Sequence, residues 1–137
     1  MVPTIQPGDR ILVNKTAYRS EDVKVGDVVV FANPEKPSLT FIKRVIALSG
    51  DEVQISGGNL TINGIIVPDR ATATTPDFGP ITVPQYNCFV LGDNVDMSKD
   101  SRHFGPIPLA TIGGQASIVY WPPFRSIHPA ESNRENQ

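Results

Sequence analysis

The sequence predicts a mainly β fold with little helix, built from twisted antiparallel sheets. No stretch of ten or more residues places apolar side chains at helical spacing, whereas short β-branched runs recur along the chain. Thirteen prolines and eleven glycines separate these runs, which is typical of a chain with frequent turns. A length of 137 residues allows one core or at most two small units.

Seven strands are expected between the turns. They cover residues 10–14, 27–32, 40–48, 52–56, 60–64, 88–92 and 116–121. A Gly-Gly-Asn connection joins the fourth and fifth strands and predicts a hairpin, because glycine adopts positive φ easily. Residues 69–84 form an extended, proline-punctuated excursion, and "IPLATIGG" (residues 107–114) is expected to hold one short helical turn.

Composition excludes several classes of protein. The net charge of −2 and the lack of a long basic run argue against a nucleic-acid partner. The single cysteine, Cys88, cannot form an internal disulfide and is expected to be a small buried hydrophobe in a strand. No apolar run approaches the roughly 18 residues that span a bilayer, and no signal segment starts the chain. The chain as given is therefore expected to be soluble.

The segment "GDNVDMSKDSRHFG" (Gly92 to Gly105) gathers polar residues between two apolar runs. It does not match a calcium-binding EF-hand loop, because the glycine and glutamate positions of such a loop are occupied by other residues. The two histidines, His103 and His128, have no cysteine or second histidine at zinc-ligand spacing. No metal or other cofactor is therefore expected, and a solvated surface loop stays open as an alternative to a site.

A second polar intrusion interrupts the apolar strand of residues 40–48. Lys43 and Arg44 project to opposite faces of this strand, so one of the two charges must approach the interior. An arginine would need a carboxylate partner, for which Asp96 and Asp100 are candidates. A desolvated lysine can lose its proton and become a base. The alternative is that Lys43 runs along the sheet to solvent.

The order of five segments resembles that of type I signal peptidases. The segments, in order from Met1 to Arg125, are "MVPTIQPGDRILVNK", "GDVVVF", "FIKRVIALSGDEV", "VLGDNVDMSKDSRHFG" and "YWPPFR". Each segment alone is a weak signal, whereas five in order are specific. The resemblance implies a signal-peptidase-like β fold, which repressor-type peptidases share.

The resemblance also implies an activity and a site. Such enzymes are membrane-anchored serine endopeptidases that remove signal peptides from preproteins on the extracytoplasmic side, after small residues in an A-x-A pattern, with a Ser-Lys dyad. Lys43 matches the general base, Ser98 the residue that orients it, and Asp100 and Arg102 a pair that shapes the site. The residues similar to those lining the small specificity pockets are Met1, Ile5, Ile11, Val30, Phe41 and Ile42.

A domain division follows from the strand pattern and the resemblance together. Residues 1–50 and 86–127 are expected to form the catalytic β core, with residues 51–85 as a small inserted hairpin module. Residues 128–137 have few apolar side chains to anchor them and are expected to be a disordered tail.

The sequence departs from the family pattern at the nucleophile. In the family a serine stands immediately before the methionine that matches Met1, so the chain as written is expected to be inactive. A truncation or misplaced start, which would also remove an upstream membrane anchor, is favoured over a soluble pseudoenzyme. Smaller departures are Val95 and Met97, in place of arginine and asparagine, and Phe104 in place of tryptophan.

Two alternatives remain open. One is a self-cleaving repressor-type Ser-Lys peptidase, which would need a DNA-binding domain and a cleavable linker that this sequence lacks. The other is a non-catalytic module that keeps a peptide-binding groove without chemistry. Preprotein signal peptides are the expected partners in the favoured interpretation.

Overall fold

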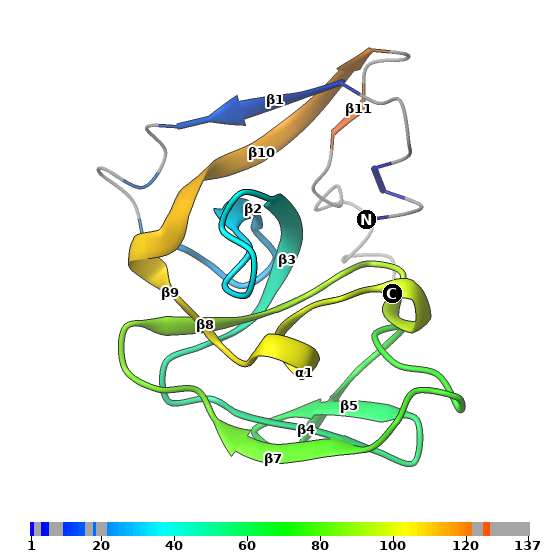
Figure 1. The fold of residues 1–137 in the computed structure, drawn as a ribbon. Helices are drawn as coiled ribbons and strands as arrows, with labels where there is room; N and C mark the ends of the chain where they lie inside the picture. Colours follow the sequence, from blue (N-terminus) through cyan, green and yellow to red (C-terminus); the bar gives the residue numbers. More distant parts are fainter. Residues whose placement is uncertain (2–3, 6–9, 16–17, 19–21, 122–124, 127–137) are drawn as a thin grey trace.

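The fold consists of two antiparallel β-sheets with very little helix, which confirms the predicted fold class (Figure 1). The computed structural model describes residue 1 and residues 4–5, 10–15, 18, 22–121 and 125–126. The predicted disordered tail, residues 128–137, lies outside the described residues. Within the described part, no helix has the length and apolar character needed to cross a membrane.

The first sheet contains the long strands that place the polar segments of interest. Its order is β1-β10-β2-β3-β8-β9, and β11 pairs with β10. The bounds are β1 Arg10–Asn14, β2 Val28–Ala32, β3 Thr40–Leu48, β8 Asn87–Leu91, β9 Ile107–Pro108, β10 Ile112–Trp121 and β11 Arg125–Ser126. β3 therefore lies inside the sheet, between β2 and β8, which suits its nearly continuous apolar sequence.

The second sheet is a smaller meander with the order β6-β5-β4-β7. The bounds are β4 Glu52–Ser56, β5 Asn59–Ile62, β6 Ile65–Val67 and β7 Phe78–Thr82. β4 and β5 are joined at Gly57 and Gly58, both with positive φ, so the predicted hairpin is present. Figure 1 shows β4, β5 and β7 at the end of the molecule opposite β1.

The two sheets share apolar packing. One buried cluster combines Ala47 and Phe89 from the first sheet with Val53 and Leu60 from the second. A further cluster lies within the first sheet, around Val29, Phe31, Val45, Cys88 and Val90. Cys88 is fully buried, as predicted, and burial raises the pKa of its thiol to about 12.

The structure corrects two details of the strand analysis. Regular alternation along residues 40–48, which puts Lys43 and Arg44 on opposite faces, would also place Val45 and Ala47 on one face. A register shift between these residues in the pairing of β3 with β8 breaks the alternation, so Val45 and Ala47 join different clusters. The strands β6, β9 and β11 were not predicted, because each has only two or three residues over which a period can be seen. β7 was not predicted because Gly79 and Pro80 interrupt it, and its residues fall in the predicted extended excursion 69–84.

The polar segment 92–105 connects β8 to β9. It contains a 3-10 turn, Val95–Met97, and one short helix, α1, Ser101–Phe104. A further 3-10 turn, Leu109–Thr111, corresponds to the predicted helical turn in residues 107–114. The β8–α1 connection therefore runs directly from the strand that neighbours β3, which brings its polar side chains to Lys43 and Arg44.

Candidate active site

Lys43 is a half-buried lysine in the middle of β3. Its Nζ donates a hydrogen bond of 3.0 Å to Ser98 Oγ and lies 5.3 Å from the centre of the Phe41 ring. Burial lowers the pKa of the Lys43 ammonium, Asp100 opposes this effect, and Arg102 adds to it. The lysine is thus placed where its neutral form, which can accept a proton, is favoured relative to a lysine in water.

Ser98 reaches Lys43 because the residue that faces it, Gly92, has no side chain. A Cβ on Gly92 would lie 2.1 Å from Ser98 Oγ and 2.6 Å from Ser98 Cβ. The same Cβ would lie 3.5 Å from Lys43 Nζ. Gly92 follows β8 directly, so the end of that strand provides the space in which the serine and the lysine meet.

Asp100 and Arg102 form a closed ion pair beneath Ser98. Asp100 is fully buried, and its two carboxylate oxygens accept hydrogen bonds from Arg102 Nε at 2.9 Å and Nη2 at 3.0 Å. The Asp100 carboxylate also accepts the backbone N–H of Gly92. Arg102 Nη2 in turn donates to the carbonyl oxygens of Val95 and Ser98. The pair therefore holds both ends of the turn that carries Ser98.

The same aspartate begins helix α1. Its side chain accepts the N–H of Arg102, and His103 Nδ1 accepts the N–H of Asp100, which makes a reciprocal cap. The side chain of His103 is half exposed. His128 lies outside the described residues. Within the described residues no group of three or more histidine, cysteine or acidic side chains could hold a metal ion.

The partner of Arg44 is Asp93, and not Asp96 or Asp100 as predicted. Arg44 is buried and donates to both carboxylate oxygens of Asp93, at 2.9 and 3.0 Å. Asp93 also accepts a hydrogen bond from Arg70 Nη1 at 2.7 Å and one from the hydroxyl of Thr4. Sequence reasoning missed this junction, although Asp93 lies two residues after the end of a buried strand and that position was a usable signal.

The contacts at this junction keep the Asp93 carboxylate ionised. Burial alone would raise the pKa of Asp93, but the hydrogen bonds from Arg44 and Thr4, the charge of Arg44 and the hydrogen bond from Arg70 lower it to about 2. Thr4 belongs to the N-terminal segment, and Arg70 lies between β6 and β7, in the stretch that the sequence predicts as an inserted module. One carboxylate therefore joins three parts of the chain.

Met1 lies close to the lysine. Burial and the neighbouring Lys43 ammonium lower the pKa of the Met1 amino group, while Asp93 opposes them. Met1 also belongs to an apolar cluster around Val28 and Ala116. The other partly buried members are Ile5, Ile11, Val30 and Ile42. Five of the six predicted pocket residues are thus brought together. Phe41 packs elsewhere, edge-on to Phe31 and beside Phe104.

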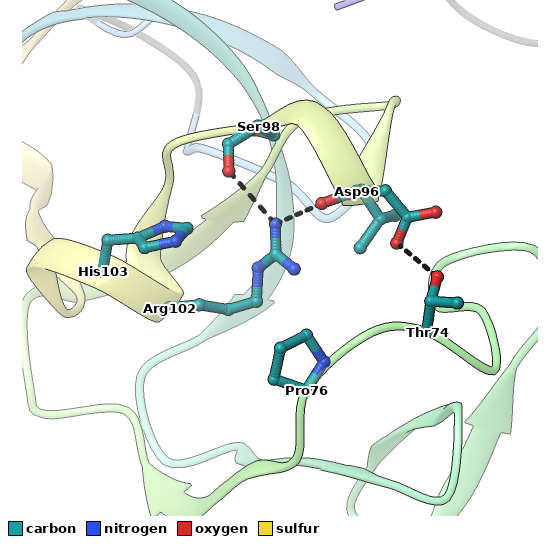
Figure 2. A pocket seen from close by; sticks show the side chains of 7 residues that line it. Thr74, Pro76, Asp96, Ser98, Arg102 and His103 are labelled. Atoms are coloured by element: carbon teal, nitrogen blue, oxygen red, sulfur yellow. Dashed lines mark hydrogen bonds between the residues drawn. The ribbon is translucent and has the colours of Figure 1, made fainter.

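A hollow of about 400 Å³ lies beside the Ser98 turn, on the side of the inserted module (Figure 2). Its lining residues are Thr74, Pro76, Val95, Asp96, Ser98, Arg102 and His103. Figure 2 shows the guanidinium of Arg102 pointing toward Ser98, and Thr74 bonded to Asp96. Asp96, predicted as a partner for arginine, instead accepts hydrogen bonds from threonines of the module.

The fold and the site define a class of protein: a two-sheet β protein in which a serine holds a lysine whose pKa is lowered by burial, next to the N-terminal segment. Residues 1–121 match the family model described as signal peptidase, peptidase S26. The chain belongs to this family, which confirms the resemblance seen in the sequence.

Individual relatives agree with the family model. The chain is 39% identical over 130 residues to a probable signal peptidase I-2 of Synechocystis sp., covering 89% of this chain and 59% of that protein. It is 40% identical over 131 residues to signal peptidase I of Leptolyngbya laminosa, covering 89% and 64%. The chain thus spans about three-fifths of the length of these relatives.

A solved structure shows the same fold. The crystal structure of a signal peptidase I from Enterococcus faecalis V583 matches with a TM-score of 0.61 and 29% sequence identity. The match covers 69% of this chain and 97% of that one.

Proposed function

We propose that this chain is the catalytic part of a serine endopeptidase that removes signal peptides from preproteins. Lys43 is the general base, and the nucleophile is the hydroxyl of a serine immediately before Met1. The observation that carries the proposal is the position of Lys43 Nζ, half-buried, 3.0 Å from Ser98 Oγ and electrostatically coupled to the Met1 amino group. A residue joined to Met1 would therefore place its side chain near the lysine.

The chemistry follows from this placement. Neutral Lys43 accepts the proton of the serine hydroxyl while the serine oxygen bonds to the carbonyl carbon of the scissile peptide. The resulting ammonium then gives its proton to the leaving amine, and the peptide C–N bond breaks. Water then attacks the ester carbonyl of the acyl-enzyme while the lysine accepts one of its protons. The lysine passes that proton to the departing serine oxygen as the ester C–O bond breaks, which restores the serine hydroxyl and releases the carboxylic acid product. Ser98 keeps the lysine in place through both steps, since its Oγ accepts a hydrogen bond from Nζ.

The remaining predicted residues have supporting roles. Asp100 and Arg102 hold the turn that carries Ser98. Met1, Ile5, Ile11, Val30 and Ile42 supply a small apolar surface that admits alanine-sized side chains, which supports cleavage after an A-x-A pattern. Phe41 contacts the lysine through its ring, from two residues earlier in β3.

The preprotein is proposed to bind as an extended strand, so that main-chain hydrogen bonds give affinity and the pockets give choice. In the whole protein, a membrane anchor upstream of Met1 would hold the site at the extracytoplasmic membrane surface. Residues 1–50 and 86–127 are proposed as the catalytic core and residues 51–85 as an inserted module.

The test adds a serine before Met1, together with an upstream anchor or detergent, and measures cleavage of a preprotein with an A-x-A site. We expect cleavage by the serine-bearing protein and none by its Lys43→Ala variant, because without the amine nothing accepts the hydroxyl proton. Lys36→Ala, in an exposed turn, is the matched control and should cleave at the parent rate.

Two outcomes contradict the proposal. If Lys43→Ala cleaves as fast as its serine-bearing parent, Lys43 is not the base. If the serine-bearing protein binds signal-peptide analogues but never cleaves them, the chain is a binding module.

A further inference from the structure

We propose that residues 70–75 of the inserted module position the active-site turn and the N-terminal segment, with Arg70 as the principal positioning residue. The proposal rests on the proposed function, because it assigns the module a part in placing the nucleophile. Arg70 and the threonines that follow it contact the two aspartates, Asp93 and Asp96, that flank the start of the Ser98 turn.

The first contact is the shared carboxylate of Asp93. Its Oδ1 accepts hydrogen bonds from both Arg44 Nε and Arg70 Nη1, and its Oδ2 accepts from Arg44 Nη2 and the Thr4 hydroxyl. Arg44 reaches Asp93 from β3, inside the core, whereas Arg70 reaches it from the module. Arg44 and Arg70 therefore fix the orientation of the Asp93 carboxylate from two sides, and this carboxylate accepts the hydrogen bond of the Thr4 hydroxyl.

The second contact is made by the threonines. Thr72 Oγ1 donates to both oxygens of Asp96, at 3.0 and 3.1 Å, and Thr75 Oγ1 lies 3.2 Å from the same carboxylate. Thr75 is buried and also accepts the N–H of Thr72, so this part of the module is itself ordered. Asp96 lies in the 3-10 turn that leads to Ser98.

Charge pairing does not require Arg70. Arg44 already makes a bidentate ion pair with the buried Asp93. The side chain of Arg70 is 22% exposed, whereas that of Arg44 is 4% exposed. Breaking a buried ion pair usually destabilises a protein because it leaves a buried charge without a partner. Removing Arg70 does not do this, since Asp93 keeps Arg44 as its partner. What the loss of Arg70 does change is the orientation of Asp93, and with it the anchor of Thr4, three residues from Met1.

The kinetic test uses the serine-bearing, membrane-anchored protein and compares Arg70→Gln with Arg70→Lys. We expect Arg70→Gln to lower kcat about tenfold with KM within about twofold, because a displaced nucleophile slows the chemical step more than binding. Arg70→Lys should recover most of the loss, since an ammonium can still donate to Asp93. Lys36→Gln, which removes one exposed positive charge, should match the parent.

A purely structural role predicts a different result. In that case Arg70→Gln lowers Tm, while kcat measured well below Tm stays at the parent value. That result, or a kcat loss that Arg70→Lys fails to recover, overturns the proposal.

A second measurement needs no catalysis. In Met1–Gln137 the N–H of Ile5 donates to the carbonyl of Met1 at 2.9 Å, so its hydrogen exchange reports on the N-terminal segment. We expect Arg70→Gln to speed this exchange about tenfold and to leave the buried N–H of Val90 unchanged. Unchanged exchange at Ile5 overturns the positioning role. If Arg70→Gln speeds exchange at Ile5 but the serine-bearing parent never cleaves a preprotein, the positioning role stands and only the proposed function is wrong.

Discussion

Lys43 illustrates how a single residue acquires chemistry from its surroundings. Position 43 of β3 leaves the lysine half-buried, with its ammonium against the Phe41 ring and the Ser98 hydroxyl. Among the described residues, no carboxylate bonds directly to this ammonium. Arg44, one residue later, projects to the other face and obtains a two-bonded carboxylate. The two adjacent cations of one strand therefore differ. The pKa of Lys43 is lowered, which favours loss of its proton, whereas an arginine such as Arg44 stays charged.

The pH dependence of the proposed reaction follows from this difference. Because burial lowers the pKa of Lys43 from its ordinary 10.5, kcat/KM should rise with pH through an apparent pKa below 10.5 and fall as the lysine becomes protonated. The measurement is a pH–rate profile of the serine-bearing protein, with ¹⁵N NMR titration of the Lys43 amine in Met1–Gln137. An amine that titrates at 10.5 or above would contradict the desolvation argument.

At the scale of elements, the site depends on how β8 ends. Gly92 lets Ser98 fold back against Lys43, and the Asp100–Arg102 pair then ties the turn to the start of α1. The turn is therefore held by groups within ten residues of one another, while its target, Lys43, comes from a different strand.

Gly92→Ala tests this arrangement. The added Cβ would overlap Ser98 Oγ, so Ser98 must move away from Lys43, and we expect cleavage by the serine-bearing protein to drop about a hundredfold. Gly113→Ala in β10 is the matched control, because its Cβ would meet only the Val30 carbonyl oxygen, at 3.6 Å. Equal activities for the two alanine variants would show that the close approach at Gly92 is dispensable.

At the scale of the whole molecule, Asp93 links the N-terminal segment, the first sheet and the inserted module. A carboxylate whose pKa falls from 3.8 to about 2 on folding stabilises the fold by about 2 kcal/mol above pH 3.8, since one pKa unit corresponds to about 1.4 kcal/mol. This contribution is lost as the pH falls through about 2.

The acid stability of Met1–Gln137 checks this value. The free energy of unfolding, measured with denaturant at pH 7, 4, 3 and 2, should decline between pH 4 and pH 2 for the parent and for the exposed control Asp22→Asn. Asp93→Asn should be less stable at pH 7, because Arg44 loses its partner, and should decline less over the acid range. If the free energy of unfolding declines equally in all three proteins between pH 4 and pH 2, the group that titrates is not Asp93.

The strands show how far sequence alone could go. β1, β3 and β4 have the predicted bounds, because alternation and β-branched content are local properties that sheet pairing reinforces. The family could also be recognised, since five short segments in order carry more information than any one of them. The site residues that were predicted are those inside these segments, such as Lys43 and Ser98.

Partner choice was beyond the sequence. Asp93, Asp96 and Asp100 lie within eight residues, and any of the three could pair with Arg44 on composition alone. The tertiary structure separates them, because the chain bends at residues 93–94 and makes a 3-10 turn at residues 95–97. Asp93 then faces Arg44, Asp96 faces the threonines of the module, and Asp100 is buried against Arg102. The bracing by Arg70, from a segment that showed no periodic signal, could be found only from the structure.

The sequence by itself determined the mainly β class, the main strands, the family and the identity of a lysine placed among apolar residues, because each depends on local pattern or on the order of motifs. Only the tertiary structure decided which carboxylate meets which cation, that a missing side chain at position 92 admits Ser98, and that residues 70–75 contact Asp93 and Asp96. These contacts depend on distances between segments that are far apart in the chain, and local sequence patterns do not determine such distances.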